Sequence, residues 1–300
     1  MSFIIFFKLL VHFLGSIILK KQTLYTTFFT SYFQGDDMNM KYVFIILALS
    51  ILTFLALPFQ NADSNLTIAG STSVQPFCEE LVEEYKKSNP DVDINVQGGG
   101  SSLGVKCANN SAAHIGMASK DVNESNLIEY ELGKEGMAIV VNNANPVDDL
   151  SSDDLRDIFS GNITDWREVS NKSGNINVLV REEGSGTFNA FKSIIMDDSD
   201  IKDDAVVQNS AGAIKQSVVQ DKDAIAFVSL CHLDKNIKSV RVDGVEISQD
   251  SIKNGSYRLQ RPFVFLTNKT PSKETLDFIN WSLSDESSEI FQNEGIIKID

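Results

Sequence analysis

Apolar residues recur with two different periods in the chain beyond residue 61. Val92, Ile94 and Val96 alternate with polar residues, which is typical of a β-strand with one buried face. Phe77 and Leu81 lie four positions apart and indicate one face of a helix. Because such strands and helices alternate along the chain, the pattern predicts an α/β protein with mostly parallel sheets.

The expected elements extend from residue 66 almost to the C-terminus. We expect strands at 66–70, 91–97, 114–119, 137–142, 176–180, 205–208, 224–230 and 261–267. We expect helices at 77–89, 105–109, 153–159, 189–196, 211–220, 273–283 and 286–291, and a hairpin at 239–247. Ser152 is expected to cap the third helix and Gly161 to end it.

The first 61 residues are interpreted as a leader. Residues 42–57 form an apolar run that follows Lys41 and precedes a polar stretch, as in a secretory signal. Two methionines stand just before Lys41, so we expect translation to start there. Residues 1–37 would then be an erroneous extension of the coding sequence. The alternatives are an uncleaved anchor at 42–57 or two membrane segments. The remainder is therefore expected outside the cytoplasmic membrane, secreted or anchored.

The charge balance limits the class of partner. The chain carries 26 Lys and Arg residues against 41 Asp and Glu residues, a formal net charge of −15. Such an acidic surface repels nucleic acid and anionic lipid, so we expect neither as a partner. A small anion must then be held by local hydrogen-bond donors that overcome the global field.

The three cysteines, Cys78, Cys107 and Cys231, are too scattered for a metal site. Cys78 and Cys107 fall on two helices expected in one lobe, so a disulfide between them is one interpretation outside the cell. The alternative is that all three are small buried hydrophobic residues.

Glycine and hydroxyl residues gather at the ends of several expected strands. The stretch 181–187 reads Arg-Glu-Glu-Gly-Ser-Gly-Thr and lies between a strand and a helix. Its glycines let backbone N–H groups converge, while Arg181, Ser185 and Thr187 can donate charge-assisted hydrogen bonds. This turn predicts a socket for a tetrahedral oxyanion that needs no metal and no other cofactor.

Five stretches in order resemble the signature of the periplasmic-type phosphate-binding proteins that feed phosphate ABC transporters. They are residues 70–76, 98–104, 115–120, 161–167 and 181–187. The resemblance covers residues 66–300. It implies a monomeric, non-enzymatic protein that captures inorganic phosphate and presents it to membrane permease subunits. The phosphate contacts that the motifs imply are Ser71, Thr72, Ser73, Ser101, Ser119, Arg181, Ser185, Gly186 and Thr187.

The resemblance also implies a two-lobed type II periplasmic-binding-protein fold. Each lobe is expected to be a mixed, mostly parallel sheet flanked by helices, with the ligand cleft between the lobes. We expect lobe I at 66–143 and 236–300 and lobe II at 144–235, joined by two crossings that act as a hinge.

Ser119 departs from the pattern of some members of the family, which have an aspartate that accepts the proton of bound hydrogen phosphate. A serine hydroxyl can donate or accept, so rejection of sulfate must come from a backbone carbonyl or a carboxylate such as Glu183. We expect Glu183 to hold Arg181 in place. We also expect phosphate to be preferred over sulfate by at least about tenfold, or about 1.4 kcal/mol.

Other functions share parts of this pattern. Residues 100–104 match the Gly-x-Ser-x-Gly turn of serine hydrolases, so a remote alternative is a hydrolase that uses Ser102 and His232. A carrier of molybdate, tungstate or sulfate, and a phosphate sensor or adhesin, would share the fold and the site.

Overall fold

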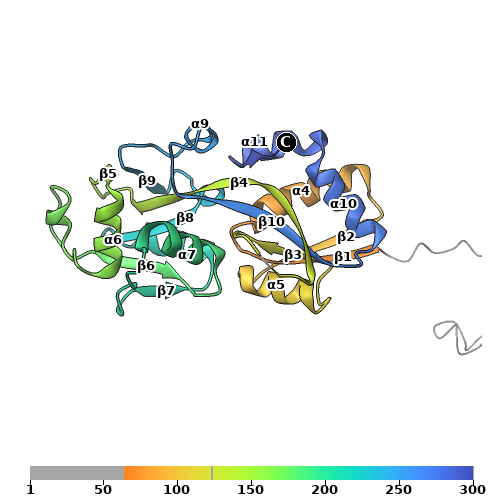
Figure 1. Ribbon diagram of the computed structural model, residues 1–300. Helices are drawn as coiled ribbons and strands as arrows, with labels where there is room; N and C mark the ends of the chain where they lie inside the picture. Colours follow the sequence, from red (N-terminus) through yellow and green to blue (C-terminus); the bar gives the residue numbers. More distant parts are fainter. Residues whose placement is uncertain (1–63, 123, 300) are drawn as a thin grey trace, which may run out of the picture. The chain divides into compact units, whose positions relative to one another are not determined.

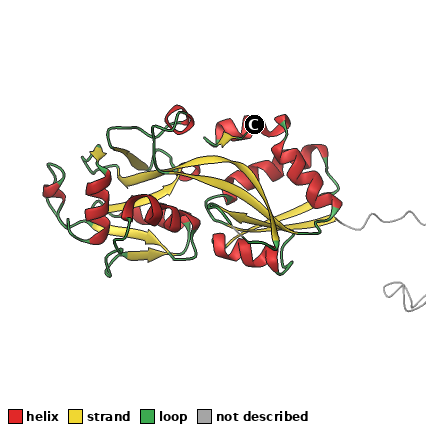
Figure 2. Cartoon of the chain, viewed as in Figure 1, coloured by secondary structure: helices red, strands yellow, loops and turns green. Residues whose placement is uncertain are grey.

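The computed structural model describes residues 64–122 and 124–299, and the expected leader lies outside this part of the chain. No helix among the described residues is long and apolar enough to cross a membrane. These residues form a mixed α/β structure (Figure 1). Their buried side chains form two large hydrophobic cores. Figure 2, with helices in red and strands in yellow, shows helices beside the strands.

The first core belongs to a sheet in the order β2-β1-β3-β10-β4. Its strands are β1 (Ser64–Gly70), β2 (Val92–Gly98), β3 (Ile115–Ala118), β4 (Leu127–Asn142), β10 (Gln260–Asn268) and β11 (Ile297–Lys298). Its helices are α4 (Gln75–Ser88), α5 (Ser101–Asn109), α10 (Lys273–Leu283), the 3-10 turn Asp285–Ser287 and α11 (Ser288–Asn293). The rings of Phe77, Phe265 and Phe278 are fully buried there, which explains the apolar spacing of α4, β10 and α10.

The second core belongs to the strands that continue this sheet in the order β4-β8-β6-β7. Its further strands are β5 (Asp149–Leu150), β6 (Asn177–Arg181), β7 (Val206–Gln208), β8 (Ala224–Ser229) and β9 (Ile237–Val242). Its helices are α6 (Ser152–Ser160), α7 (Gly186–Phe191), α8 (Ala211–Gln220) and α9 (Gln249–Lys253), with 3-10 turns at Trp166–Glu168 and Leu230–His232. Phe191 and Phe227 stack at 4.2 Å between ring centroids, so α7 is fixed against the sheet by its apolar face.

The two halves share the long strands β4 and β10. The first part of β4 pairs antiparallel with β10, while Met137 to Asn142 pairs antiparallel with β8 and β9. The outer pairs, β1 with β2 and β3, and β6 with β7 and β8, are parallel. The sheet is therefore mixed, with parallel strands outside and antiparallel strands where the chain crosses between halves.

The lobe boundaries remain a prediction, and the cores suggest different positions for them. The second core begins at Met137 within β4 and includes Ile237, Val240 and Leu259. We propose that the crossings lie near Gly136 and Leu259, in place of the expected positions near residues 143 and 236.

Several local expectations were wrong. Ser151, not Ser152, caps α6, because its hydroxyl accepts from the Asp154 N–H and Asp154 reciprocates in a capping box. The expected hairpin at 239–247 is only a turn with one bridge between Val242 and Val245. The helix expected at 189–196 begins at Gly186 and ends in a π-helical segment, Lys192–Met196.

The cysteines form no disulfide within the part of the chain that the structure describes. Cys78 is fully buried in the first core, and Cys107 and Cys231 are partly buried. Burial raises the pKa of the Cys78 thiol well above its usual value, so this residue acts as a small apolar side chain.

Candidate functional site

The loops that carry the expected contacts follow the carboxyl ends of four strands. Residues 71–73 follow β1, Ser101 follows β2, Ser119 follows β3, and residues 182–187 follow β6. Binding sites of α/β sheets form at such ends, because the loops of neighbouring parallel strands meet there. The structure brings all nine expected residues into one region, seven of them with side chains buried in the fold. These are Ser71, Ser73, Ser101, Ser119, Arg181, Ser185 and Thr187, each no more than 3% exposed.

Gly70 allows the first three loops to approach one another. Its φ is +143°, and an added Cβ would lie only 2.2 Å from the Met117 carbonyl oxygen of β3. The Gly70 carbonyl oxygen accepts from the N–H groups of Gly99 and Gly100 at 2.8 and 2.9 Å. A side chain at position 70 would push β3 and the loop after β2 away from β1.

Three serine hydroxyls of the first half form a connected cluster. The Ser71 hydroxyl donates to Ser119 Oγ at 3.0 Å, and Ser101 Oγ lies 3.3 Å from Ser119 Oγ. The Ser119 N–H also donates to Ser101 Oγ, at 3.1 Å. Buried hydroxyls so arranged can reorient toward an anion without further movement of the chain.

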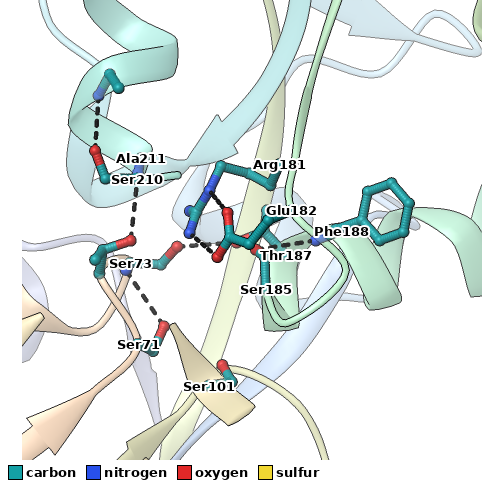
Figure 3. Close-up of polar contacts among 12 residues, drawn as sticks. Ser71, Ser73, Ser101, Arg181, Glu182, Ser185, Thr187, Phe188, Ser210 and Ala211 are labelled. Atoms are coloured by element: carbon teal, nitrogen blue, oxygen red, sulfur yellow. Dashed lines mark hydrogen bonds and ion pairs between the residues drawn. The ribbon is translucent and has the colours of Figure 1, made fainter. Parts of the chain in front are cut away.

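Loops of the two halves meet at this cluster. Ser73 Oγ lies 2.9 Å from Thr187 Oγ1, and the Ala211 N–H of α8 donates to Thr72 Oγ1 at 3.3 Å. The Ser102 N–H donates to the Gly184 carbonyl oxygen at 3.1 Å. Figure 3 shows Ser71, Ser73 and Ser101 on one side facing Arg181, Ser185 and Thr187 on the other.

Arg181 is held by Glu182, and the expectation that Glu183 would do this was wrong. Arg181 donates through Nε and Nη2 to the two Glu182 carboxylate oxygens, each at 2.9 Å (Figure 3). The Arg181 side chain is 2% exposed, whereas Glu183 is exposed and its carbonyl oxygen accepts from Asn189. This bidentate contact fixes the plane of the guanidinium and leaves its other N–H groups for a ligand.

Ser185 and Gly186 shape the loop in different ways. The Ser185 hydroxyl accepts from the Phe188 N–H at 3.3 Å, so it caps α7. A Cβ added to Gly186 would lie 2.5 Å from Ser101 Oγ and 2.6 Å from Ser119 Oγ. The absent side chain at position 186 is what allows α7 to approach the serine cluster.

Arg261 and Glu135 are site residues that the sequence analysis missed. They are opposite each other in the register of β4 and β10, and Arg261 Nε donates to Glu135 Oε2 at 3.0 Å. Burial lowers the pKa of Arg261 and raises the pKa of Glu135, and their ion pair opposes both shifts. The only signal in the sequence was one arginine in an otherwise apolar stretch at the start of β10.

The residues of the hydrolase alternative are not arranged as a catalytic pair. His232 Nε2 lies 3.1 Å from the Thr72 carbonyl oxygen, and burial lowers the pKa of its imidazole. No hydrogen bond joins Ser102 to His232 among the described residues. Residues 64–122 and 124–299 also hold no cluster of three or more His, Cys, Asp or Glu side chains suited to a metal ion. The groups that do converge are hydrogen-bond donors, as an anion requires.

This fold and this site define a two-lobed binding protein. A family model described as a PBP superfamily domain matches residues 58–286, and the chain therefore belongs to the PBP superfamily. The fold class expected from the sequence is thereby confirmed, as is the resemblance to the phosphate-binding proteins.

Relatives of known name and structure agree with this assignment. The chain is 34% identical to a Clostridium perfringens protein described as a phosphate ABC transporter substrate-binding protein with bound phosphate, with a TM-score of 0.76 over 79% of this chain and 100% of that one. An ABC-type phosphate transport receptor from Vibrio cholerae is 33% identical, with a TM-score of 0.64 over 78% and 100% of the two chains. The phosphate-binding protein PstS of Bacillus subtilis is 27% identical over 250 residues, which are 80% of this chain and 82% of the relative.

Proposed function

We propose that this chain captures inorganic phosphate outside the cytoplasmic membrane and delivers it to the permease subunits of an ABC transporter. The observation that carries the proposal is the convergence of buried hydroxyls and the Arg181 guanidinium from loops of both halves. These groups suit a tetrahedral oxyanion, whose four oxygens accept hydrogen bonds from several directions. The relatives' names supply the ligand and the transporter.

Binding is proposed to occur without catalysis. Two contacts among the described residues support this: His232 contacts a carbonyl oxygen, and the serine cluster is hydrogen-bonded to itself and to Arg261. The contacts proposed for phosphate are those expected from the motifs: Ser71, Thr72, Ser73, Ser101, Ser119, Arg181, Ser185, Gly186 and Thr187. We also propose that the protein acts as a monomer, as a carrier that meets its permease one molecule at a time.

Calorimetric titration of the purified chain with phosphate, sulfate, molybdate and tungstate tests the ligand. We expect phosphate to bind more tightly than sulfate by at least about tenfold, equal to about 1.4 kcal/mol. If molybdate or tungstate binds more tightly than phosphate, that anion replaces phosphate as the proposed ligand. If none of the four anions binds, the adhesin and hydrolase functions return as candidates.

A further inference from the structure

Arg261 lies at the point where the two halves and the serine cluster meet. Its side chain is 1% exposed, and its Nη1 donates both to Ser119 Oγ, at 3.1 Å, and to Thr187 Oγ1. Ser119 follows β3 in the first half, whereas Thr187 lies in α7 of the second. One guanidinium nitrogen therefore contacts a candidate phosphate-binding residue from each half.

Glu135 holds Arg261 in place through its Nε. The Glu135 carboxylate is fully buried and accepts from Arg261 Nε, from the Ser229 hydroxyl at 2.6 Å and from the Leu230 N–H. Its oxygens are thus occupied by donors of the protein. A buried ion pair with this many hydrogen bonds holds the guanidinium in one orientation, because breaking it would leave an uncompensated charge.

Arg261 still has one nitrogen without a partner. Its Nη2 is buried and makes no hydrogen bond within the described residues, although Nε and Nη1 are both engaged. A buried unpaired N–H is costly, so native proteins seldom retain one that serves nothing. Arg181 lies close enough for its charge to contribute to the lowered pKa of Arg261. An anion between the two guanidinium groups would accept a hydrogen bond from Nη2 of Arg261. It would also offset the repulsion between the two positive charges.

The contacts of Arg261 also decide how the Ser119 hydroxyl can act. Ser119 Oγ accepts from Arg261 Nη1 and from the Ser71 hydroxyl, which together use both lone pairs of the oxygen. Its own hydrogen is then available only for donation, to Ser101 Oγ at 3.3 Å or to a ligand. Arg261 Nη1 also donates to Thr187 Oγ1, so one lone pair of that oxygen is used as well.

We infer that Arg261 is the second cation of the anion site and that it makes Ser119 a hydrogen-bond donor to the ligand. This rests on the proposed function and concerns how that site recognises its anion. Position 119 then supplies no acceptor for a phosphate proton, so the fully deprotonated sulfate dianion can also enter. Any preference for phosphate must come from an acceptor elsewhere in the site, and the Glu182 carboxylate, which binds Arg181, is our candidate for it.

Phosphate and sulfate affinities of the full chain and two Ser119 variants test this inference. The wild type should bind sulfate weakly but measurably. Ser119→Ala should weaken both anions by the same factor, within about twofold, because it removes a donor that both would use. Ser119→Asp should raise the phosphate-to-sulfate preference by at least about tenfold, since its carboxylate would pair with Arg261 and face sulfate with an acceptor.

Arg261→Gln tests the cation directly. It should weaken both anions by at least about tenfold, whereas Arg241→Gln, on the exposed part of β9, should change neither. Thermal unfolding of each variant shows whether it is folded, and the Ser119 variants decide the question if Arg261→Gln is not.

Three results would overturn the inference. The first is a wild type that binds phosphate but shows no sulfate binding at a sulfate concentration of about 1,000 times the phosphate Kd. The second is a Ser119→Ala variant that loses affinity for phosphate but not for sulfate, and the third is a folded Arg261→Gln variant with unchanged affinities. A wild type that binds no phosphate is a different result and counts against the proposed function itself.

Discussion

The hydroxyl groups of Ser73 and Thr187 lie 2.9 Å apart, although 114 positions separate them in the chain. Ser73 follows β1 of the first half, and Thr187 lies in α7 of the second, so their contact joins the two. Both are also candidate phosphate contacts. In the proposed function, closure of the two halves and binding of phosphate would therefore use the same side chains, which is how a ligand shifts the population toward a closed form.

Phosphate should make the protein more compact. The contacts between Ser73 and Thr187 and between Thr72 and Ala211 form only when the halves are together. A ligand that binds both sides adds favourable energy to the closed form alone. Small-angle scattering should show a smaller radius of gyration at saturating phosphate. An unchanged scattering profile would argue against a hinge between the halves.

Arg181→Ala should reduce phosphate affinity strongly. The substitution removes a buried guanidinium and leaves the Glu182 carboxylate beside the site without its partner. Loss of one charge-assisted partner in a desolvated cleft costs about 2 to 5 kcal/mol of binding free energy. Calorimetry measures the change, with Arg241→Ala as the control for removing a surface arginine. An affinity within about threefold of the wild type would place the anion elsewhere.

Gly186→Ala should damage the site through shape alone. The added methyl group would lie 2.5 Å from Ser101 Oγ and 2.6 Å from Ser119 Oγ, so the serine cluster or α7 must move. Overpacking of this kind costs about 1 to 3 kcal/mol, and we expect at least that loss in phosphate binding. Gly212→Ala is the matched control, because a Cβ there would meet nothing within 4 Å. The control should bind phosphate normally and unfold at a slightly higher temperature, since alanine favours the α8 helix.

The loops of the site could be predicted because their signals are local. Glycine and hydroxyl residues stand directly after β1, β2, β3 and β6, and the strands themselves showed clear apolar periods. Their convergence followed from the rule that loops at the carboxyl ends of strands meet. None of this required knowledge of which strands pair across the crossing between halves.

Arg261 and Glu135 could not be found in this way, because their meeting depends on long-range register. They are 126 positions apart and face each other only through the pairing of β10 with β4. The first part of β4 was itself missed, since Gly133, Gly136 and several charged residues conceal its strand period. The choice between Glu182 and Glu183 as the partner of Arg181 depended on the path of the turn, which composition does not specify.

The pH dependence of folding should contain a contribution from His232. Burial lowers the pKa of its imidazole in the folded chain, and the nearby charges of Lys215 and Arg261 add to the effect. The unfolded chain therefore binds the proton more readily, with a pKa of about 6.5. Stability should rise with pH through the window below that value and fall as acid protonates the unfolded imidazole first.

His232→Gln tests this contribution, because glutamine keeps a donor for the Thr72 carbonyl oxygen but does not titrate. Denaturant unfolding at pH 5 and pH 7 should show that the wild type loses more free energy of unfolding at pH 5 than the variant does. His114→Gln, at an exposed position before β3 where Nδ1 accepts from the Thr67 N–H, controls for removal of an imidazole that is not buried. Parallel losses in the wild type and His232→Gln would mean that His232 has the same proton affinity in the folded and unfolded chains.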